Sequence, residues 1–348
     1  MDNVLLSNPL VAVVILNWNG RNYLEKFLPS VVQFSGTAKI IVADNHSTDD
    51  SVDFLKMNYP QIEILYNGEN GGFAKGYNDA LRQIKADYFV LLNSDVEVTE
   101  NWIFPVIYWM EKHPEAAACQ PKIMDYYNKD KFEYAGACGG FIDSFGYPFC
   151  RGRIFNTCET DVGQYQNPIE IFWATGACMF VRAVDFFNVH GFDDDYFAHM
   201  EEIDLCWRLK NEGKSIWVIP ESKVFHVGGG TLKKISPRKT YLNFRNNLIT
   251  FLKNHPKHNL VSKFILRLFL DGIAGLKFFV SGSPLHCWAV VKAHFSFYFF
   301  LGSTLKKRKK IAGQQIGNQN KTGMLNSSIV YLYYIKTKKY FSELNFTD

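Results

Sequence analysis

Carboxylates stand at two places in the sequence where they could do chemistry, and the first is Asp95. It follows the apolar run at 88–92 after only Asn93 and Ser94, so we expect it at the end of a buried strand. Carboxylate oxygens bind divalent cations, and such a cation can bridge the oxygens of a diphosphate. Asp95 is therefore a candidate metal ligand, although a polar turn that closes a strand has the same pattern.

A second acidic cluster, Glu201, Glu202 and Asp204, lies near the predicted start of a helix at 200–212. Acidic residues at this position commonly complement the helix dipole. A carboxylate in a partly closed site is also the usual group that removes a proton from a sugar hydroxyl. The cluster therefore predicts either a stabilised helix start or a general base.

Two other motifs could contact the same ligand. Residues 70–78 read NGGFAKGYN, where glycines let the backbone approach a ligand, a helix start favours anions, and Lys75 adds positive charge. The spacing is not that of the dinucleotide-binding fingerprint, and a glycine-bearing turn is the structural alternative. His226, which precedes three glycines, could complete a metal site with Asp95 or could be a structural histidine.

The elements expected to position these residues alternate between strands and helices. Asn17, Asp44 and Asn70 follow the first three strands, and ligands of such sheets bind beyond the carboxyl ends of the strands. We therefore expect these side chains to share one crevice with Asp95. The alternation predicts an α/β fold with a mainly parallel sheet and helices on both faces. Strands are predicted at 10–16, 39–43, 62–66 and 88–92, and helices at 22–34, 48–58 and 73–85.

The second half of the chain is less regular. Residues 115–170 are rich in Gly and aromatic side chains without periodicity, which predicts an irregular insertion over the crevice. Regular structure is expected to return at 175–182. Further on, the patterns predict a helix at 200–212, a strand at 215–219, and helices at 241–254 and 260–280.

Charge divides the 348 residues into two parts of opposite sign. Residues 1–230 contain 18 Lys and Arg against 31 Asp and Glu, a balance of −13, whereas residues 231–348 contain 20 against 3, a balance of +17. Two different partners are implied. We therefore expect a catalytic domain at 1–235 and a basic helical region at 236–348.

The sequence also indicates a compartment. Its first residues lack a basic segment followed by an apolar stretch, so the cytoplasm is the expected location. No apolar run reaches the roughly 18 residues that a membrane-spanning helix needs. The seven cysteines are odd in number and contain no C-x-x-C pair, which predicts reduced, mostly buried thiols rather than disulfides or a zinc site.

Taken in order over residues 10–250, the motifs resemble glycosyltransferase family 2 on a GT-A fold, and in particular the rhamnosyltransferase-like branch of bacterial surface-polysaccharide enzymes. Each motif alone is loose, but their order is specific. The matching segments are VVILNWNG (13–20), IVADNHSTDDS (41–51), NGGFAKGYN (70–78), LLNSDV (91–96), ATGACMFVR (174–182), FDDDYFAHMEEIDLCWRL (192–209) and FHVGGGT (225–231).

The resemblance implies roles for individual residues. Asp44 matches the acid that contacts the nucleotide base or ribose, and Asn17 lies in the same pocket. Asp95 matches the last, metal-binding acid of the D-x-D element, and His226 matches a histidine that joins the metal or the diphosphate. Glu202 takes the second position of the pair that supplies the catalytic base. The further implied positions are Asn70, Gly72, Lys75, Asn78, Asn93 and Ser94 for the donor, Trp173, Thr175 and Gly176 for the acceptor, and Glu201 and Asp204 beside the base.

Two positions depart from the family pattern. Asn93 replaces the first acid of the D-x-D element, which removes one negative charge from the metal site. Glu202 stands where Asp is usual, so the carboxylate reaches one methylene further and Glu201 is a rival base.

The implied reaction is an inverting transfer that uses Mg2+ or Mn2+. The donor would be a dTDP- or UDP-sugar, with dTDP-rhamnose as the first candidate, and the acceptor a glycan or a polyprenyl-diphosphate-linked glycan. Two alternatives are a nucleotidyltransferase of the same fold and a non-catalytic nucleotide-sugar-binding module. The former is disfavoured because residues 17–20 contain no Lys or Arg.

The basic C-terminal part interleaves cations with aromatic side chains between 238 and 310. Helices of this composition lie in membrane interfaces, and basic residues there attract anionic lipid. We therefore expect peripheral attachment to the inner face of the cell membrane, with a basic face over an ordinary helical core as the alternative. No recognised nucleic-acid module accompanies the charge, so nucleic acid is not an expected partner.

Overall fold

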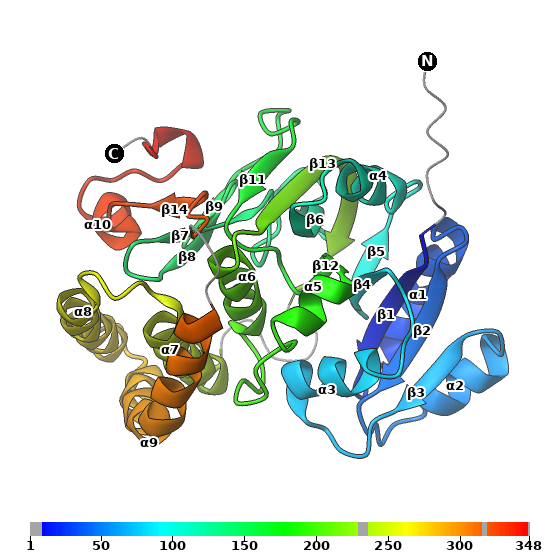
Figure 1. Cartoon of the computed structure of the whole chain (residues 1–348), viewed down its shortest axis with the longest axis horizontal. Coiled ribbons are helices and arrows are strands. Elements are labelled where there is room, and N and C mark those ends of the chain that lie inside the picture. The colour runs from blue at the N-terminus through cyan, green and yellow to red at the C-terminus, as the bar shows by residue number, and fades with distance from the viewer. Residues whose placement is uncertain (1–8, 229–235, 315–318, 347–348) are drawn as a thin grey trace.

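The computed structural model describes residues 9–228, 236–314 and 319–346 (Figure 1). A sheet at its centre contains β1 (Val11–Asn17), β2 (Lys39–Asp44), β3 (Glu63–Tyr66), β4 (Tyr88–Asn93), β5 (Val96–Val98), β6 (Ala116–Asp125), β11 (Ile169–Ile171), β12 (Cys178–Arg182) and β13 (Ser215–His226). The strands lie in the order β11, β13, β6, β12, β4, β1, β2, β3, and β5 pairs with β13.

The sheet combines parallel and antiparallel pairs. β1 is parallel to β2 and β4, β2 is parallel to β3, and β6 is parallel to β13. β12 runs antiparallel to both of its neighbours, β4 and β6. The predicted α/β fold class is confirmed, and the sheet is more mixed than expected because β12 enters it in the reverse direction.

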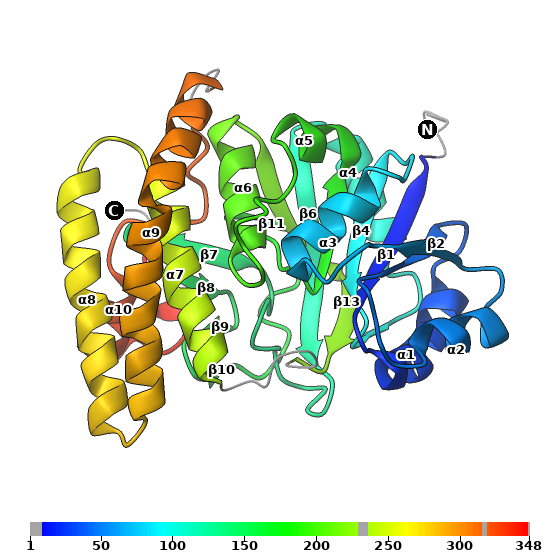
Figure 2. The same ribbon diagram turned by 90° about the horizontal axis from the view of Figure 1, so that it is seen from below.

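Helices cover both faces of this sheet (Figure 2). The helices of the described residues are α1 (Arg21–Phe34), α2 (Ser51–Asn58), α3 (Gly72–Leu81), α4 (Phe104–Lys112), α5 (Ala183–Asn188), α6 (Glu201–Asn211), α7 (Pro237–Asn254), α8 (Leu260–Val280), α9 (Pro284–Gln314) and α10 (Ile329–Tyr334). One apolar core joins the sheet to α1, α2 and α4, and another joins it to α3, α6 and α7. Along β4, Val90 and Leu92 enter the first core while Phe89 and Leu91 enter the second, as the alternation of a strand requires.

Most of the predicted helices are confirmed close to their expected ends. α7 starts earlier than the periodicity indicated because Ser236 caps it, its hydroxyl accepting a hydrogen bond from the backbone N–H of Lys239 at 3.2 Å. Pro237 occupies the first turn, where a missing N–H costs nothing. The strand predicted at 215–219 continues as β13 to His226.

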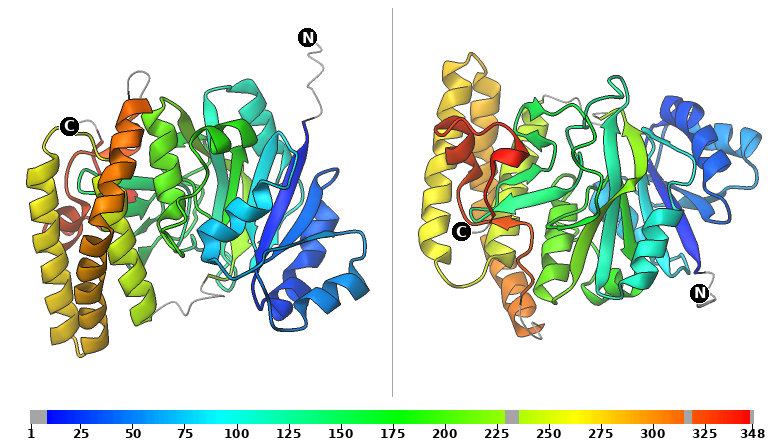
Figure 3. Two further views of the ribbon diagram at one scale, coloured as in Figure 1. Left: turned by 60° about the horizontal axis from the view of Figure 1, so that its bottom comes forward. Right: turned by 90° about the horizontal axis from the view of Figure 1, so that it is seen from above.

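The insertion at 115–170 is more regular than predicted. After β6 it forms a second sheet of short strands, β7 (Gly140–Asp143), β8 (Pro148–Cys150), β9 (Arg153–Ile154) and β10 (Thr157–Cys158). Strands of two to four residues are too short to show alternation in a sequence. β14 (Met324–Leu325) pairs in parallel with β7, so the C-terminal segment lies against the insertion (Figure 3).

The helices α7, α8 and α9 stand side by side at one end of the molecule (Figure 2). α7 lies between α6 and α9 and contacts both. The predicted division into 1–235 and 236–348 stays a prediction, because residues 229–235 lie outside the described residues, as does the end of the FHVGGGT motif. Within the described segments, we find no helix long and apolar enough to cross a membrane.

Candidate active site

A cavity of about 720 Å³ opens where β4 and β13 end. Its walls come from distant parts of the chain: residues 93–95 after β4, 131–135 of the insertion, 175–177 before β12, and 197–199 before α6. The predicted site residues that line it are Asn70, Gly72, Asn93, Ser94, Asp95, Thr175, Gly176, Glu201, Glu202 and His226. The fold thus brings most of the predicted site into one cavity.

Asn17 and Asp44 support the cavity without lining it. They are register partners at the ends of β1 and β2, and both are buried. Asn17 Nδ2 donates to Asp44 Oδ1 at 3.3 Å and to Ser51 Oγ at 3.0 Å. Their chain neighbours Trp18 and Asn45 line the cavity instead.

Lys75 and Asn78 lie on α3 outside the cavity lining. Lys75 Nζ makes an ion pair of 2.6 Å with Asp79, which raises the pKa of the lysine. Asn78 Nδ2 donates to the carbonyl oxygen of Phe192 at 2.9 Å and so ties α3 to the segment that leads towards α6. Both side chains are therefore placed to support the site from outside.

Trp173 and Asp204 are also held inside the fold. Trp173 is 2% exposed and its Nε1 donates to the carbonyl oxygen of Phe141 at 2.8 Å. Asp204 is fully buried and makes ion pairs with Arg208 at 2.9 Å and Lys253 at 2.8 Å. Neither lines the cavity, so neither is placed to contact a ligand there.

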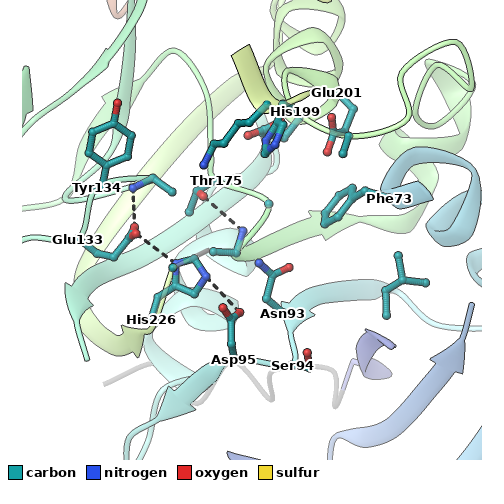
Figure 4. A pocket seen from close by; sticks show the side chains of 18 of the residues that line it. Phe73, Asn93, Ser94, Asp95, Glu133, Tyr134, Thr175, His199, Glu201 and His226 are labelled. Carbon is teal, nitrogen blue, oxygen red and sulfur yellow. Dashed lines mark hydrogen bonds and ion pairs between the residues drawn. The ribbon is translucent and has the colours of Figure 1, made fainter. Parts of the chain in front are cut away.

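His226 lies between two carboxylates on one wall of the cavity (Figure 4). Its Nε2 is 3.2 Å from Asp95 and its Nδ1 is 3.4 Å from Glu133. Burial lowers the pKa of His226, but the two carboxylates outweigh burial and raise this pKa to about 10. The ring is therefore protonated at neutral pH and carries a positive charge into the cavity beside Asp95.

Glu201 and Glu202 face the cavity from the first turn of α6, and Figure 4 shows Glu201 across from His226. Burial, followed by the charge of Glu202, raises the pKa of Glu201 well above its usual range. Burial also raises the pKa of Glu202, to about 7, while nearby backbone N–H groups and Lys239 oppose that rise. Glu201 thus keeps its proton, and Glu202 is the carboxyl group that ionises near neutrality.

The glycine motif touches the loop that precedes these acids. Gly72 has a φ of +78°, and a Cβ there would lie 2.1 Å from the carbonyl oxygen of Phe197. The backbone N–H of Phe73 donates to that same oxygen at 2.7 Å. A residue with a side chain at position 72 would therefore push residues 70–73 away from the 193–200 loop.

The 193–200 loop ends in a strained backbone. His199 and Met200 have φ values of 71° and 76°, so two consecutive residues with side chains adopt the left-handed conformation directly before Glu201. Each such residue costs roughly 1–2 kcal/mol relative to the right-handed conformation. Strain of this kind persists only where surrounding contacts hold the backbone.

Several lining residues carried no signal in the sequence. Glu133 belongs to the insertion that has no periodicity, and only the fold places it beside His226. His199 is half-buried, and loss of solvent around the ring, followed by the charge of Lys239, lowers the pKa of this imidazole to about 4, so it is neutral. Lys239 lines the cavity, although its basic stretch predicted a membrane-facing surface or a basic face over a helical core. Trp18 also lines the cavity, and because it stands inside a quoted motif, VVILNWNG (13–20), it could have been named from the sequence.

The carboxylate oxygens of Asp95 suit a hard divalent cation whose other ligands would come from a substrate. Within residues 9–228, 236–314 and 319–346, no three His, Cys, Asp or Glu side chains are grouped to hold a metal without further ligands. Mg2+ in particular is commonly bound through one or two carboxylates plus substrate phosphates. Asp95 fits that pattern, whereas His226 would have to lose its proton before it could bind the same ion.

Comparison with known proteins decides the family. The sequence profile described as "Glycosyl transferase family 2" matches residues 12–183. The chain belongs to this family. The glycosyltransferase is 27% identical over 239 residues to N-acetylglucosaminyl-diphospho-decaprenol L-rhamnosyltransferase of Mycobacterium tuberculosis, covering 62% of this chain and 76% of that protein. It is 25% identical over 228 residues to rhamnosyltransferase WbbL of Escherichia coli, covering 62% and 83%.

Solved structures show the same GT-A fold. The glycosyltransferase aligns with a mannosyltransferase from Pyrobaculum calidifontis, solved with GDP-Man and Mn2+, at a TM-score of 0.53 and 13% identity, over 84% of this chain and 88% of that one. It aligns with GalNAc-T7, solved with UDP, GalNAc and Mn2+, at a TM-score of 0.56 and 16% identity, over 70% of this chain and 48% of that one. The predicted GT-A fold and enzyme class are confirmed.

Proposed function

We propose that this glycosyltransferase moves a hexosyl residue from a nucleotide-diphosphate donor, with dTDP-rhamnose as the first candidate, to a hydroxyl of a polyprenyl-diphosphate-linked glycan. Both bacterial relatives are named as rhamnosyltransferases, which supports this sugar, and the name of the Mycobacterium tuberculosis relative supports this class of acceptor. The observation that carries the proposal is the position of Glu202, whose pKa is about 7, in the same cavity as Asp95.

In the proposed reaction, Glu202 takes the proton of the acceptor hydroxyl, and the hydroxyl oxygen attacks the anomeric carbon of the donor. The bond between that carbon and the diphosphate oxygen breaks, so attack from the opposite face inverts the anomeric centre. Protonated Glu201 and neutral His199 lie beside the base and add no charge that would compete with it. A walled cavity limits the access of water, which would otherwise replace the acceptor.

The diphosphate would lie on the opposite wall from the base. Asp95 would hold Mg2+ or Mn2+ together with the diphosphate, and the cation would supply positive charge against the leaving group. The imidazolium of His226 adds a positive charge beside Asp95. Trp18 and Asn45, which line the cavity next to the buried Asn17–Asp44 pair, would contact the nucleoside.

A thermal-shift screen of dTDP-, UDP- and GDP-sugars with and without Mn2+ tests the proposal. A ligand that binds only the folded state at about 100 times its Kd adds ~2.7 kcal/mol to the free energy of unfolding. We expect dTDP-rhamnose with Mn2+ to raise the melting temperature most, and to release dTDP when an acceptor is present. If no nucleotide sugar shifts the melting temperature and none is cleaved, the proposal is wrong.

We also propose that α8 and α9 attach the enzyme to an anionic membrane. Their outward faces carry exposed apolar side chains, which we name the docking face: Val261, Ile265, Phe269, Ile273, Leu276, Phe279 and Val280 on α8, and Leu285, Trp288, Phe295 and Phe299 on α9. The only acidic residue between 236 and 314 is Asp271, which is fully buried beside Arg267. Exposed lysines are therefore not neutralised by acids of this region, which suits anionic lipid.

The docking face reaches the end of the molecule where the cavity opens. His286, in the first turn of α9, contacts Thr240 Oγ1 at 2.8 Å, and Thr240 adjoins the cavity-lining Arg238 and Lys239. Figure 2 shows the turn between α8 and α9 at the same end as the start of α7. A membrane at this surface would therefore present the headgroup of a lipid-linked acceptor near the cavity.

Flotation with liposomes tests this attachment. We expect the enzyme to float with vesicles that contain anionic lipid, and the double variant Phe279→Glu, Trp288→Glu to lose at least two thirds of that binding, because the new charges oppose both apolar insertion and anionic lipid. Phe104→Glu on α4 is the matched control, since Phe104 is also an exposed aromatic residue. Equal flotation of the double variant and the control would contradict the assignment of the docking face.

A further inference from the structure

The 193–200 loop needs restraint from outside itself. It leads directly into the first turn of α6, where Glu201 and Glu202 face the cavity, and its last two residues are in the left-handed conformation. A loop with this backbone has no local reason to keep its shape, because the left-handed region is disfavoured for residues with a Cβ. The contacts that hold it therefore decide where the two acids lie.

The middle of α7 supplies such contacts to the end of the loop. Asn246 is fully buried, and its Nδ2 donates to the carbonyl oxygen of Ala198 at 3.0 Å and to that of His199 at 2.7 Å. Arg245 Nε donates to Asn246 Oδ1 at 2.7 Å, which orients the amide so that its NH2 group faces the loop. The guanidinium of Arg245 also donates to the carbonyl oxygen of Asp195 at 3.1 Å.

Charged and hydroxyl groups hold the beginning of the same loop. Lys253 on α7 and Lys307 on α9 both make ion pairs of 2.5 Å with Asp193. Burial opposes ionisation of Asp193, but these two lysines prevail and lower the pKa of this carboxyl group below its usual range. Further along, the hydroxyls of Tyr196 and Thr250 are 2.7 Å apart. The loop is thus fastened along its length to the C-terminal helices.

We propose that Asn246 is a positioning residue, which holds the left-handed end of the 193–200 loop so that Glu202 points into the cavity. This inference rests on the proposed role of Glu202 as the base. It assigns to α7 a part in catalysis that is separate from membrane attachment. The residue touches neither substrate nor reacting atoms and acts only through the carbonyl oxygens of the two residues at 198 and 199.

The test compares Asn246→Ala with Asn247→Ala. Asn247 is the next residue of α7 and is also buried, but its Nδ2 donates to the carbonyl oxygen of Gly146, with only a 3.9 Å contact to the sulfur of Met200. We expect Asn246→Ala to lower kcat at least tenfold, to leave the donor-induced thermal shift within its error, and to speed hydrogen exchange in peptides that cover 193–204. Asn247→Ala should change kcat less than threefold.

The pH profile separates positioning from a general loss of stability. A loosened loop admits water to Glu202, so the acidic limb of the kcat profile should move to lower pH in Asn246→Ala and not in Asn247→Ala. The positioning role is overturned if Asn246→Ala and Asn247→Ala lose the same stability and also show the same kcat, the same pH profile and the same hydrogen exchange in 193–204. If the wild type neither binds nor cleaves a nucleotide sugar, the proposed function fails instead.

A second variant keeps the inference testable if Asn246→Ala does not fold. Lys307→Met removes the ion pairs to Asp193 and Asp195 from a side chain that is 36% exposed, so the core is left intact. We expect a fall in kcat of threefold or more, again with the donor-induced thermal shift retained. The matched control is Lys309→Met, on the exposed side of the same helix. Equal kcat values for these two variants would overturn the inference.

Discussion

Replacing Glu202 by Gln is expected to lower kcat for glycosyl transfer at least a hundredfold. The amide keeps the size of the side chain but cannot accept the proton of the acceptor hydroxyl, and a positioned base contributes about 10²–10⁴ to a rate. Release of nucleoside diphosphate measures the loss. Donor binding, measured as the thermal shift in the presence of Mn2+, should stay close to that of the wild type, because Glu202 lies at the acceptor side in the proposed reaction.

The neighbouring acid supplies the comparison. Glu201 holds its proton because burial and the charge of Glu202 raise its pKa well above the usual range, so Gln at position 201 resembles the native protonated side chain. We expect Glu201→Gln to lower kcat less than tenfold. If Glu201→Gln is the inactive variant and Glu202→Gln is active, the assignment of the base is wrong and Glu201 takes the role.

The same geometry sets the sign of the pH dependence. Glu202 works as a base only when ionised, and its pKa is raised to about 7, so kcat should fall as the pH drops below about 7. The groups that act on this carboxyl group are Glu201 beside it, Lys239 from α7 and the backbone N–H groups of the first turn of α6. In Glu202→Gln the residual rate should lose this acidic limb.

Replacing Asp95 by Asn is expected to have the second large effect. The substitution removes the carboxylate that we propose as the metal ligand, and a metal contributes several kcal/mol to the stabilisation of developing charge. Since ~2.7 kcal/mol corresponds to a hundredfold change in rate, we expect kcat/KM to fall by about a hundredfold or more. The increase in melting temperature that Mn2+ adds to donor binding should disappear.

Asp125 offers a matched control for Asp95→Asn. Its carboxylate also lines the cavity, but Oδ1 accepts hydrogen bonds from the backbone N–H groups of Tyr127 and Asn128 at 2.9 Å and 2.8 Å, and so closes its own turn. We expect Asp125→Asn to keep the Mn2+-dependent shift. A Mn2+-dependent shift that survives in Asp95→Asn would mean that the cation is held elsewhere or is not used.

Much of the fold could be predicted from short-range patterns. The apolar runs that became β1, β2 and β4 are mostly buried, so each reads as a continuous apolar stretch that needs no knowledge of its neighbours. β3 lies at the edge of the sheet and is only partly buried. The helices α1, α6 and α8 carry an apolar period that is likewise local. The short strands of the insertion escaped prediction because their pairing is decided across the chain, as in the pairing of β14 with β7.

Local patterns likewise predicted part of the candidate site, and the fold decided the rest. The order of motifs along the chain was sufficient to indicate the family and to name Asp95, Glu202 and His226 as candidates, because each lies at a locally marked end of an element. Asp95 follows β4, Glu202 is in the first turn of α6, and His226 ends β13. Nothing local distinguishes Glu202 from Asp204, two positions away. Only the fold buries Asp204 against Arg208 and leaves Glu202 facing the cavity.

Long-range contacts account for the rest, since a protonation state depends on whatever surrounds a group in space. His226 carries a positive charge because the insertion brings Glu133 to one side of the ring while β4 brings Asp95 to the other. From the sequence, the C-terminal helices were expected to attach to a membrane, with a basic face over an ordinary helical core as the alternative. In the folded chain, Asn246 of α7 also contacts the loop that leads to the proposed base, because folding brings residues 246 and 199 within hydrogen-bonding distance.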